Sequence, residues 1–296
     1  DSVASRGLGD VYKRQVEGLP EHRPPARPCA GNDGGSRRSG IIQDVRRSMP
    51  RNVTIESRGN VPQHVHAITL VRHGRTAFNA QHRLQGQINI PLDEVGEWQV
   101  RQTARALREL YVDHRPDIPN RLVVCSDLDR AAATAHAFAD PLGLTVHADE
   151  RVRERSFGDW EGVAVEELAE RYPEDYRSWA EFRGGELKYG AESKEHVGKR
   201  GVEALNDWAM RAGTDTDLFV FSHGAWISQT LQTLLGLNEV QPDFASILSM
   251  RNAHWVRLVP IEIGDTLRWR LLDYNHGPAI ADTEQWEHPR RQGLDF

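Results

Sequence analysis

Two histidines stand at the ends of short apolar runs, and each is followed by a glycine. The run 67–71 leads through Arg72 into His73, and the run 218–221 leads through a serine into His223. Such runs indicate buried strands, and the carboxyl ends of parallel strands meet at the edge of an open α/β sheet where ligands bind. We therefore expect the two imidazoles to lie together, where a neutral imidazole can act as a nucleophile toward phosphorus.

Two arginines accompany these histidines. Arg72 precedes His73, and a third strand-like run, 122–125, leads within a few residues to Arg130. Planar guanidinium groups match the oxygens of a phosphoryl group, and nearby cations favour the neutral form of an imidazole. The spacing therefore predicts a phosphate pocket in which Arg72, Arg130 and His223 surround the nucleophile His73.

A carboxyl group would complete such a site, because a departing alkoxide needs a proton. The best candidate is Glu154, which lies in an Arg-Glu-Arg stretch. In the alternative interpretation, Glu154 forms a structural ion pair with Arg151, Arg153 or Arg155. Both interpretations stay open from the sequence.

Strand-like and helix-like patterns alternate along the chain from residue 65. The expected elements are strand 67–71, helix 94–110, strand 122–125, helix 130–139, strand 144–147, helix 193–210, strand 218–221, helix 226–235 and strands 247–259 and 267–274. This alternation predicts an α/β fold with three α/β/α layers around a mostly parallel sheet. Residues from about 155 to 195 interrupt the alternation with Gly184, Gly185 and Gly190, and we expect them to form a small cap insertion over the site.

Several large or apolar side chains have expected positions in this scheme. Leu110 should lie on the buried side of the first long helix. Cys125 ends an apolar run and should be a small core residue. Trp160 and Trp255 are expected to pack in the interior rather than to contact a ligand.

The first 64 residues differ in composition from the rest. They carry 11 Lys and Arg against 7 Asp and Glu, with many prolines and glycines and little apolar periodicity, so we expect a disordered basic extension. The string 10–15 resembles a translated sequencing-library adapter, which suggests that residues 1–15 are an artefact and that Met49 is the native start. A genuine basic tail is the alternative. The catalytic domain is expected over 65–285, followed by a frayed polar tail over 286–296.

Charge and cysteine content narrow the class of protein. Residues 65–296 hold the remaining 26 Lys and Arg and 36 Asp and Glu, and such an acidic domain argues against a nucleic-acid partner. Two cysteines, Cys29 and Cys125, imply no disulfide framework and favour a cytoplasmic location. No apolar run approaches the length of a membrane span, so no membrane partner is expected. Scattered histidines show no metal-ligand spacing.

Four motifs together carry a family resemblance. They are Arg72-His73-Gly74-Arg75-Thr76 with Asn79, Ser126-Asp127-Leu128 with Arg130 and Thr134, Glu154 with residues 157–162, and Ser222-His223-Gly224. In this order, over about residues 67–235, the chain resembles the histidine phosphatase superfamily in its phosphoglycerate mutase-like branch. The resemblance implies a phosphorylated His73, a phosphate pocket of Arg72, Arg130 and His223, and Glu154 as the proton donor. It implies Asn79 as a further phosphate contact, and neither a metal nor another cofactor.

The family contains both mutases and phosphatases. Its mutases carry a paired-arginine stretch and a proline-rich run in the cap, and neither occurs between residues 161 and 199. The segments 250–255, 268–271 and 274–275 are similar to the glucosyl-3-phosphoglycerate phosphatase group. The stretch 190–193 reads Gly-Ala-Glu-Ser and departs by one residue from the Gly-Gly-Glu-Ser of those enzymes.

The sequence thus predicts a metal-independent phosphomonoesterase of the histidine acid phosphatase type. Its expected partner is a small phosphorylated metabolite, a sugar- or glycerate-type monoester hydrolysed through a phosphohistidine. A mutase-type phosphoryl transfer and a non-catalytic phosphate-binding relative are the alternatives, and a homodimer stays open. The further substrate-binding candidates are Gly74, Arg75, Gln85 and Gly224.

Overall fold

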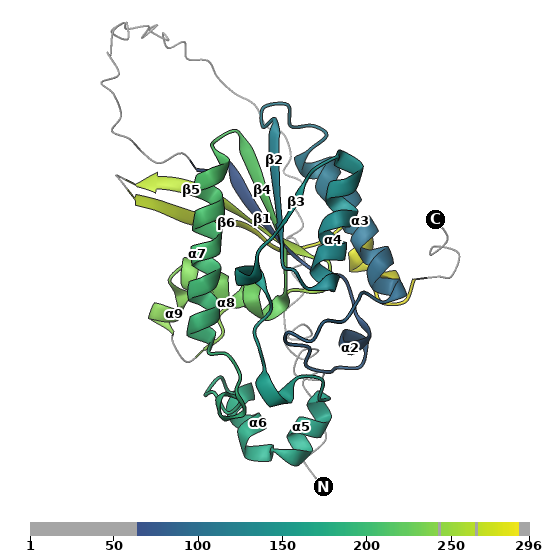
Figure 1. Cartoon of the computed structure of the whole chain (residues 1–296), viewed down its shortest axis with the longest axis vertical. Helices are drawn as coiled ribbons and strands as arrows, with labels where there is room; N and C mark the ends of the chain where they lie inside the picture. The colour runs from purple at the N-terminus through teal and green to yellow at the C-terminus, as the bar shows by residue number, and fades with distance from the viewer. Residues whose placement is uncertain (1–63, 242–243, 264–265, 290–296) are drawn as a thin grey trace, which may run out of the picture. The chain divides into compact units, whose positions relative to one another are not determined.

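The structure is a computed structural model that describes residues 64–241, 244–263 and 266–289. The expected N-terminal extension, with Cys29 and the proposed start at Met49, lies outside the described residues. Within them, six strands form one sheet in the order β3-β2-β4-β1-β5-β6 (Figure 1). The strands are β1 (Ala67–Arg72), β2 (Asn120–Cys125), β3 (Val146–Ala148), β4 (Thr216–Ser222), β5 (Trp255–Ile263) and β6 (Thr266–His276).

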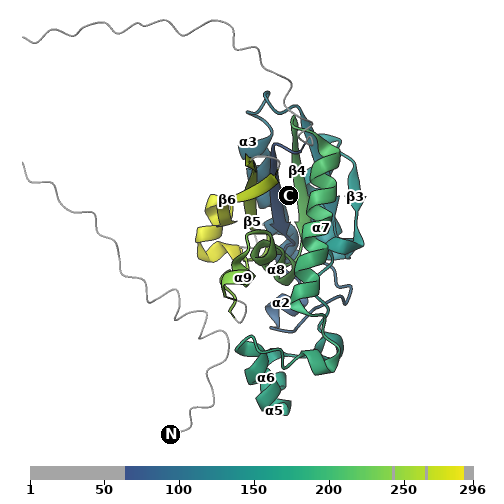
Figure 2. The same cartoon turned by 90° about the vertical axis from the view of Figure 1, so that its left-hand side faces the viewer.

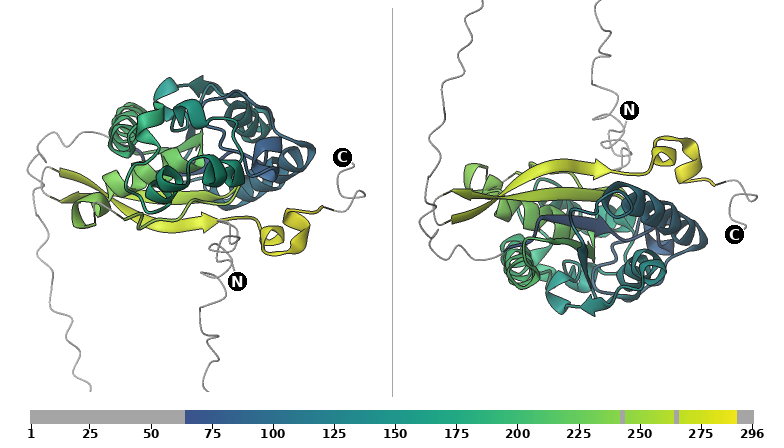
Figure 3. Two further views of the ribbon diagram at one scale, coloured as in Figure 1. Left: turned by 90° about the horizontal axis from the view of Figure 1, so that it is seen from below. Right: turned by 90° about the horizontal axis from the view of Figure 1, so that it is seen from above.

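The strand directions confirm a mostly parallel sheet. β3, β2, β4 and β1 pair in parallel, whereas β5 pairs antiparallel with both β1 and β6. The parallel strands therefore bring their carboxyl ends to one edge. β6 lies at the edge of the sheet, and the end-on views in Figure 3 show it beside β5 with the C-terminal turns beyond its arrowhead.

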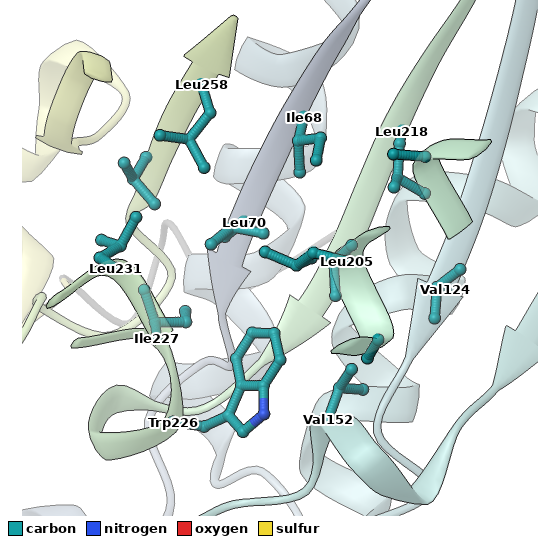
Figure 4. Close-up of a cluster of buried hydrophobic side chains, with 14 of the residues drawn as sticks. Ile68, Leu70, Val124, Val152, Leu205, Leu218, Trp226, Ile227, Leu231 and Leu258 are labelled. Carbon is teal, nitrogen blue, oxygen red and sulfur yellow. The ribbon is translucent and has the colours of Figure 1, made fainter. Parts of the chain in front are cut away.

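Alternating side chains of the central strands face two helical layers. Ile68 and Leu70 pack with α7 (Lys194–Ala212) and α8 (Gly224–Leu234) in the core cluster drawn in Figure 4. Val71 points to the other face and packs with α3 (Glu94–Tyr111) and α4 (Asp129–Ala139). Because successive strand residues point to opposite faces, both faces of β1 are apolar and both are covered. The predicted three layers are confirmed.

Two of the long helices begin next to polar residues whose side chains cap them. Asp93 caps α3 through a 2.7 Å bond from the amide of Gly96, and Ser193 caps α7 through a 3.1 Å bond from the amide of His196. After α4, Pro141 and Gly143 form the short turn η1 (Asp140–Leu142) and its left-handed end, with a φ of 65° at the glycine. The expectation for Leu110 was wrong, because this side chain is 47% exposed.

The fifth strand begins later than the sequence pattern predicts. β5 starts at Trp255, whereas alternating apolar residues predicted a strand from residue 247. The residues just before Trp255 form a loop rather than a strand. The amide of Ala253 bonds to the carbonyl of His73, and the amide of Arg72 bonds to the carbonyl of His254. These bonds attach the segment to the end of β1, and Ala253 takes a left-handed φ of 56°.

The cap lies between β3 and α7. It contains η3 (Gly158–Trp160), α5 (Val165–Arg171), α6 (Pro173–Ala180) and η4 (Leu187–Tyr189). Figures 1 and 2 show α5 and α6 beyond the carboxyl ends of the parallel strands. The cap has its own small core around Phe157, Trp160 and Leu168, in which Trp160 is fully buried. Trp160 and Trp255 are therefore packing residues, as predicted.

The C-terminal turns are more ordered than their polar sequence predicts. After β6 come η5 (Ala279–Asp282) and η6 (Glu284–Trp286). Trp286 is fully buried, with its ring centroid 5.5 Å from that of Trp98 on α3. The predicted frayed tail is thus wrong for residues 286–289, because one aromatic side chain anchors the segment, and residues 290–296 lie outside the described part. Within the described part, no helix has both the length and the apolar character needed to cross a bilayer.

Candidate active site

His73 sits at the end of β1 and is only 2% exposed. Its Nδ1 lies 2.7 Å from the carbonyl oxygen of Gly74, an acceptor, so Nδ1 carries the proton and Nε2 keeps its lone pair. The backbone is held on both sides. The amide of His73 bonds to the carbonyl of Ser222 at 3.0 Å, and its carbonyl accepts bonds from Ala253 N at 3.0 Å and Asn252 Nδ2 at 3.1 Å.

The second predicted imidazole lies beside the first. The ring centroids of His73 and His223 are 5.1 Å apart, and His223 is fully buried. Among the described residues, neither ring nitrogen of His223 has a hydrogen-bond partner. Buried polar atoms are normally bonded, so this imidazole is suited to a bound ligand.

Two guanidinium groups complete the cluster, one of them fully buried and the other partly buried. Arg130, at the start of α4, is fully buried and donates to the carbonyls of Ile88 and Gly86, each at 2.8 Å. Its Nε has no partner among the described residues. Arg72 is the last residue of β1, and its Nη1 donates a hydrogen bond to the carbonyl of Met250. The acceptors of both guanidinium groups are backbone carbonyls. These carbonyls orient the guanidinium groups and, being uncharged, do not neutralise them.

Burial and these cations set the charge of the two imidazoles. Burial, followed by Arg130 and Arg72, holds the pKa of His73 well below its usual value. Burial, followed by Arg130 and His73, does the same to the pKa of His223. Both rings are therefore neutral near pH 7. The sequence predicted the sign of the effect for His73 but attributed it to the arginines, whereas burial is the larger cause. Burial also lowers the pKa of Arg130, to about 10.

Glu154 lies at the N-terminus of α8 and is 9% exposed. Its carboxylate accepts backbone bonds from Trp226 and Arg155 at 2.8 Å and from Ala225 at 3.2 Å. The first turn of a helix has free N–H groups, so a carboxylate fits here. Because α8 directly follows His223, the same helix terminus places the carboxylate and the second imidazole close together.

The alternative ion pairs of Glu154 are not formed. Arg151 pairs with Asp149 at 2.8 Å, Arg153 with Asp127 at 2.7 Å, and Arg155 with Glu186 at 2.6 Å. Each neighbouring arginine is thus occupied by another carboxylate. Among the described residues, the hydrogen bonds to the Glu154 carboxylate therefore come from backbone amides.

Arg200, on α7, fastens the loop that carries this carboxylate. Its Nη1 donates to the carbonyls of Arg151 at 2.7 Å and Arg153 at 2.8 Å, and its Nη2 donates to the carbonyl of Glu154 at 3.0 Å. Its Nε and Nη2 also bond both carboxylate oxygens of Glu192, at 2.8 and 3.0 Å. Arg200 was not identified from the sequence. The available signal was the Gly-Ala-Glu-Ser stretch, because its glutamate is Glu192, the partner of Arg200.

Asn79 and Gln85 both bond to Thr76, three residues after His73. Asn79 Oδ1 accepts bonds from Asn252 Nδ2 at 3.1 Å and from the amide of Thr76 at 3.2 Å. Gln85 Oε1 accepts a bond from the Thr76 hydroxyl at 2.9 Å. Asn252 therefore links Asn79 to the carbonyl of His73. Sequence reasoning gave Asn252 no role, because the link depends on a loop nearly 180 residues further along the chain.

The remaining candidates have mainly structural contacts. A Cβ on Gly74 would lie 2.7 Å from the carbonyl oxygen of Gly96, a backbone atom, so this position requires glycine. A Cβ on Gly224 would lie 2.8 Å from Oγ of Ser249 and 3.2 Å from Cζ of Arg72, so a larger residue would displace these side chains. The Arg75 guanidinium donates to Asp93 at 2.9 Å and to the carbonyl of Glu287 at 3.2 Å. These bonds engage Arg75 away from the imidazole pair, and its substrate contact stays a prediction.

Comparisons with known proteins agree with this geometry. A family model described as "Histidine phosphatase superfamily (branch 1)" matches residues 68–274. A glucosyl-3-phosphoglycerate phosphatase from Mycolicibacterium vanbaalenii is 31% identical over 74% of this chain and 98% of its own length. A probable phosphoglycerate mutase from Yersinia enterocolitica is 34% identical over 72% of this chain and 87% of its own. A solved structure of a mycobacterial glucosyl-3-phosphoglycerate phosphatase complexed with VO3 has 28% identity and a TM-score of 0.61, covering 72% of this chain and all of that one.

Proposed function

The chain belongs to the histidine phosphatase superfamily, and from this premise we propose that it hydrolyses a small phosphate monoester through a phosphohistidine at His73. The observation that carries the proposal is the pair of buried, neutral imidazoles 5.1 Å apart, flanked by Arg72 and Arg130. A neutral nucleophile among fixed cations suits attack on an anionic phosphoryl group.

In the first step, Nε2 of His73 attacks phosphorus and the bond from phosphorus to the ester oxygen breaks. Arg72, Arg130 and His223 hold the phosphoryl oxygens, whose charge is spread in the transition state. Glu154 in its protonated form gives its proton to the departing alkoxide, so the alcohol leaves neutral. The Nδ1 bond to Gly74 keeps the proton away from the attacking nitrogen.

In the second step, water attacks the phosphorus and the bond from phosphorus to nitrogen breaks. The Glu154 carboxylate now accepts the proton of that water, which restores the acid form and releases inorganic phosphate. The residues named supply every proton and charge that the two steps need, so the proposal includes no metal or other cofactor. Of the chain's two cysteines, Cys125 is buried and unbridged, and we place the enzyme in the cytoplasm.

The substrate class we propose is a sugar- or glycerate-type monoester. The relative from Mycolicibacterium vanbaalenii supports glucosyl-3-phosphoglycerate as the first compound to test. The relative from Yersinia enterocolitica supports a second candidate, transfer of the phosphoryl group between positions of phosphoglycerate. We favour hydrolysis because the cap sequence lacks the arginine pair and the proline-rich run expected of a mutase.

Rapid acid quench with labelled substrate tests the mechanism. The wild-type enzyme should yield an acid-labile phosphoprotein, and His73→Ala should give neither label nor turnover. An Arg171→Met variant, changed at an exposed position on α5, serves as the control and should retain the label. Turnover that survives in His73→Ala would refute the mechanism. Incubation with 3-phosphoglycerate separates the two candidates, because a phosphatase releases phosphate and a mutase yields the isomer.

A further inference from the structure

A cavity that none of the imidazole-site residues lines lies between the cap and α8. Its volume is about 280 Å³, a size suited to a sugar-sized group rather than a single ion. The lining includes Phe182 from the cap, Lys194 at the start of α7, Gln229 on α8 and Asn238 on α9 (Leu237–Val240).

Helix α8 leads from the imidazole site, at its N-terminus, to this cavity, which its later residues Gln229 and Gln232 line. Ala225, in the first turn, packs against the aromatic cluster of the cap. Gln229 and Gln232 follow it at spacings of four and three residues, so the three side chains share that face. From His223 to Gln229 is about 9 Å along the helix axis. A substrate with its phosphate between the imidazoles can therefore reach the cavity with its far end.

The positive charge of Lys194 in the lining is available to a bound ligand. Lys194 Nζ lies 4.5 Å from the centre of the Phe182 ring, and the nearby carboxylate that acts on its charge, Glu186, is already bonded to Arg155 at 2.6 Å. Glu195, which also lines the cavity, is paired with Lys199 at 2.6 Å. Burial lowers the pKa of Lys194, and a bound anion would offset that effect.

The donors and acceptors of the wall define what would fit. Asn238 Oδ1 is a buried acceptor that receives no bond from the described residues, so it suits a hydroxyl donor. Phe182 and Phe244 are 39% and 57% exposed and offer ring faces to the C–H groups of a polyol. The complementary ligand has hydroxyl groups and a carboxylate.

We propose that this cavity binds the alcohol part of the substrate, a hydroxylated chain with a carboxylate, and that Lys194 selects the carboxylate. This inference rests on the proposed function and specifies the substrate for the same site. It makes Lys194 and Asn238 specificity residues, while the imidazoles and arginines bind only the phosphate.

Competitive inhibition of p-nitrophenyl phosphate hydrolysis tests the inference. The matched probes are 6-phosphogluconate and sorbitol 6-phosphate, which share a six-carbon chain and differ in the terminal carboxylate. Lys194→Met should weaken 6-phosphogluconate about tenfold, as expected for one charge-assisted bond, and sorbitol 6-phosphate less than about twofold. Lys194→Arg should restore most of the difference. Arg211→Met, at the exposed far end of α7, removes one equal charge and should change neither.

Other outcomes would overturn it. Equal weakening of both probes, or none, would show that Lys194 does not read a carboxylate. Gluconate that alters the rate without competing with p-nitrophenyl phosphate, and only when Lys194 is present, would identify a separate effector site instead. If p-nitrophenyl phosphate is not hydrolysed at all, the proposed function fails on its own. Calorimetric titration of the same proteins with both probes still decides whether the cavity prefers the carboxylate.

Discussion

At the scale of single residues, the position of Glu154 gives the sharpest expectation about catalysis. Glu154→Gln should lower turnover of alkyl phosphates by about 10²–10⁴, because their alkoxide leaving groups need the proton. Hydrolysis of p-nitrophenyl phosphate should fall less than about tenfold, since nitrophenolate leaves without one. Steady-state rates on both ester types measure the difference.

The amide oxygen of the glutamine can still accept the bonds from Trp226 and Arg155, which both go to Oε1, whereas the weaker 3.2 Å bond from Ala225 to Oε2 is lost. The start of α8 should therefore keep most of its shape. Acid-labile label should still form in this variant with the aryl substrate. If both ester types lose activity equally, Glu154 has a structural role and the proton comes from elsewhere.

The residues at the strand ends could be predicted because a strand tip is a local signal. The apolar runs before His73 and His223 and the glycine after each are visible in a few consecutive letters. The role of Asn252 was not visible in the same way, because its bonds to the His73 carbonyl and to Asn79 depend on tertiary folding. Contacts between residues so far apart in the chain produce no periodic pattern in the sequence from which they could be predicted.

At the scale of elements, α7 holds the loop that carries Glu154 through the bonds of Arg200. Arg200→Met would remove the bonds that Arg200 donates to the carbonyls of Arg151, Arg153 and Glu154. It should lower kcat for alkyl phosphates far more than for p-nitrophenyl phosphate. Arg200→Lys should recover part of the loss. In a Glu154→Gln background the same change should have little further effect, because the two residues act on one step.

Exposed Arg171 on α5 provides the matched control, and Arg171→Met should leave all rates unchanged. Thermal unfolding of each variant identifies general destabilisation. A uniform loss on both ester types, unchanged by the Glu154→Gln background, would mean that Arg200 supports the fold and not the acid.

Elements were predictable where one face is buried and the ends carry caps. α3 and α7 begin after Asp93 and Ser193, as their caps indicate. The pattern failed around Ile247, where alternating apolar residues belong to a loop that packs along β1 rather than to a strand. It failed again at Trp286, since one buried aromatic ring anchors a segment whose other residues are polar.

At the scale of the whole molecule, buried neutral histidines couple folding to pH. The folded-state pKa values of His73 and His223 lie well below 6.5, and that of His254 is lowered to about 4, in each case chiefly by burial. Below pH 6.5 these histidines bind protons in the unfolded chain but stay neutral in the folded chain. The free energy of unfolding should therefore fall as the pH falls. The slope should approach about 1.4 kcal/mol per pH unit for each histidine.

Urea unfolding at pH 7.5, 6.0 and 5.0 measures this slope. The window ends at pH 5 because carboxylates with lowered pKa values, such as Asp127 beside Arg153, lose their own stabilisation at lower pH. A His73→Asn/His223→Asn double variant should show a clearly smaller slope. An unchanged slope would assign the pH dependence to other groups.

The attachment of the His73 carbonyl to Asn252 and Ala253 has a consequence for reading genomes. A reading frame with a stop codon just before Asn252 would keep all four motifs, and a motif search would score it as an intact enzyme. Its product would lack β5, β6 and the bonds that hold the nucleophile in place. Whether such a gene encodes an enzyme or is a pseudogene is therefore decided by its last stretch of codons rather than by its signature residues.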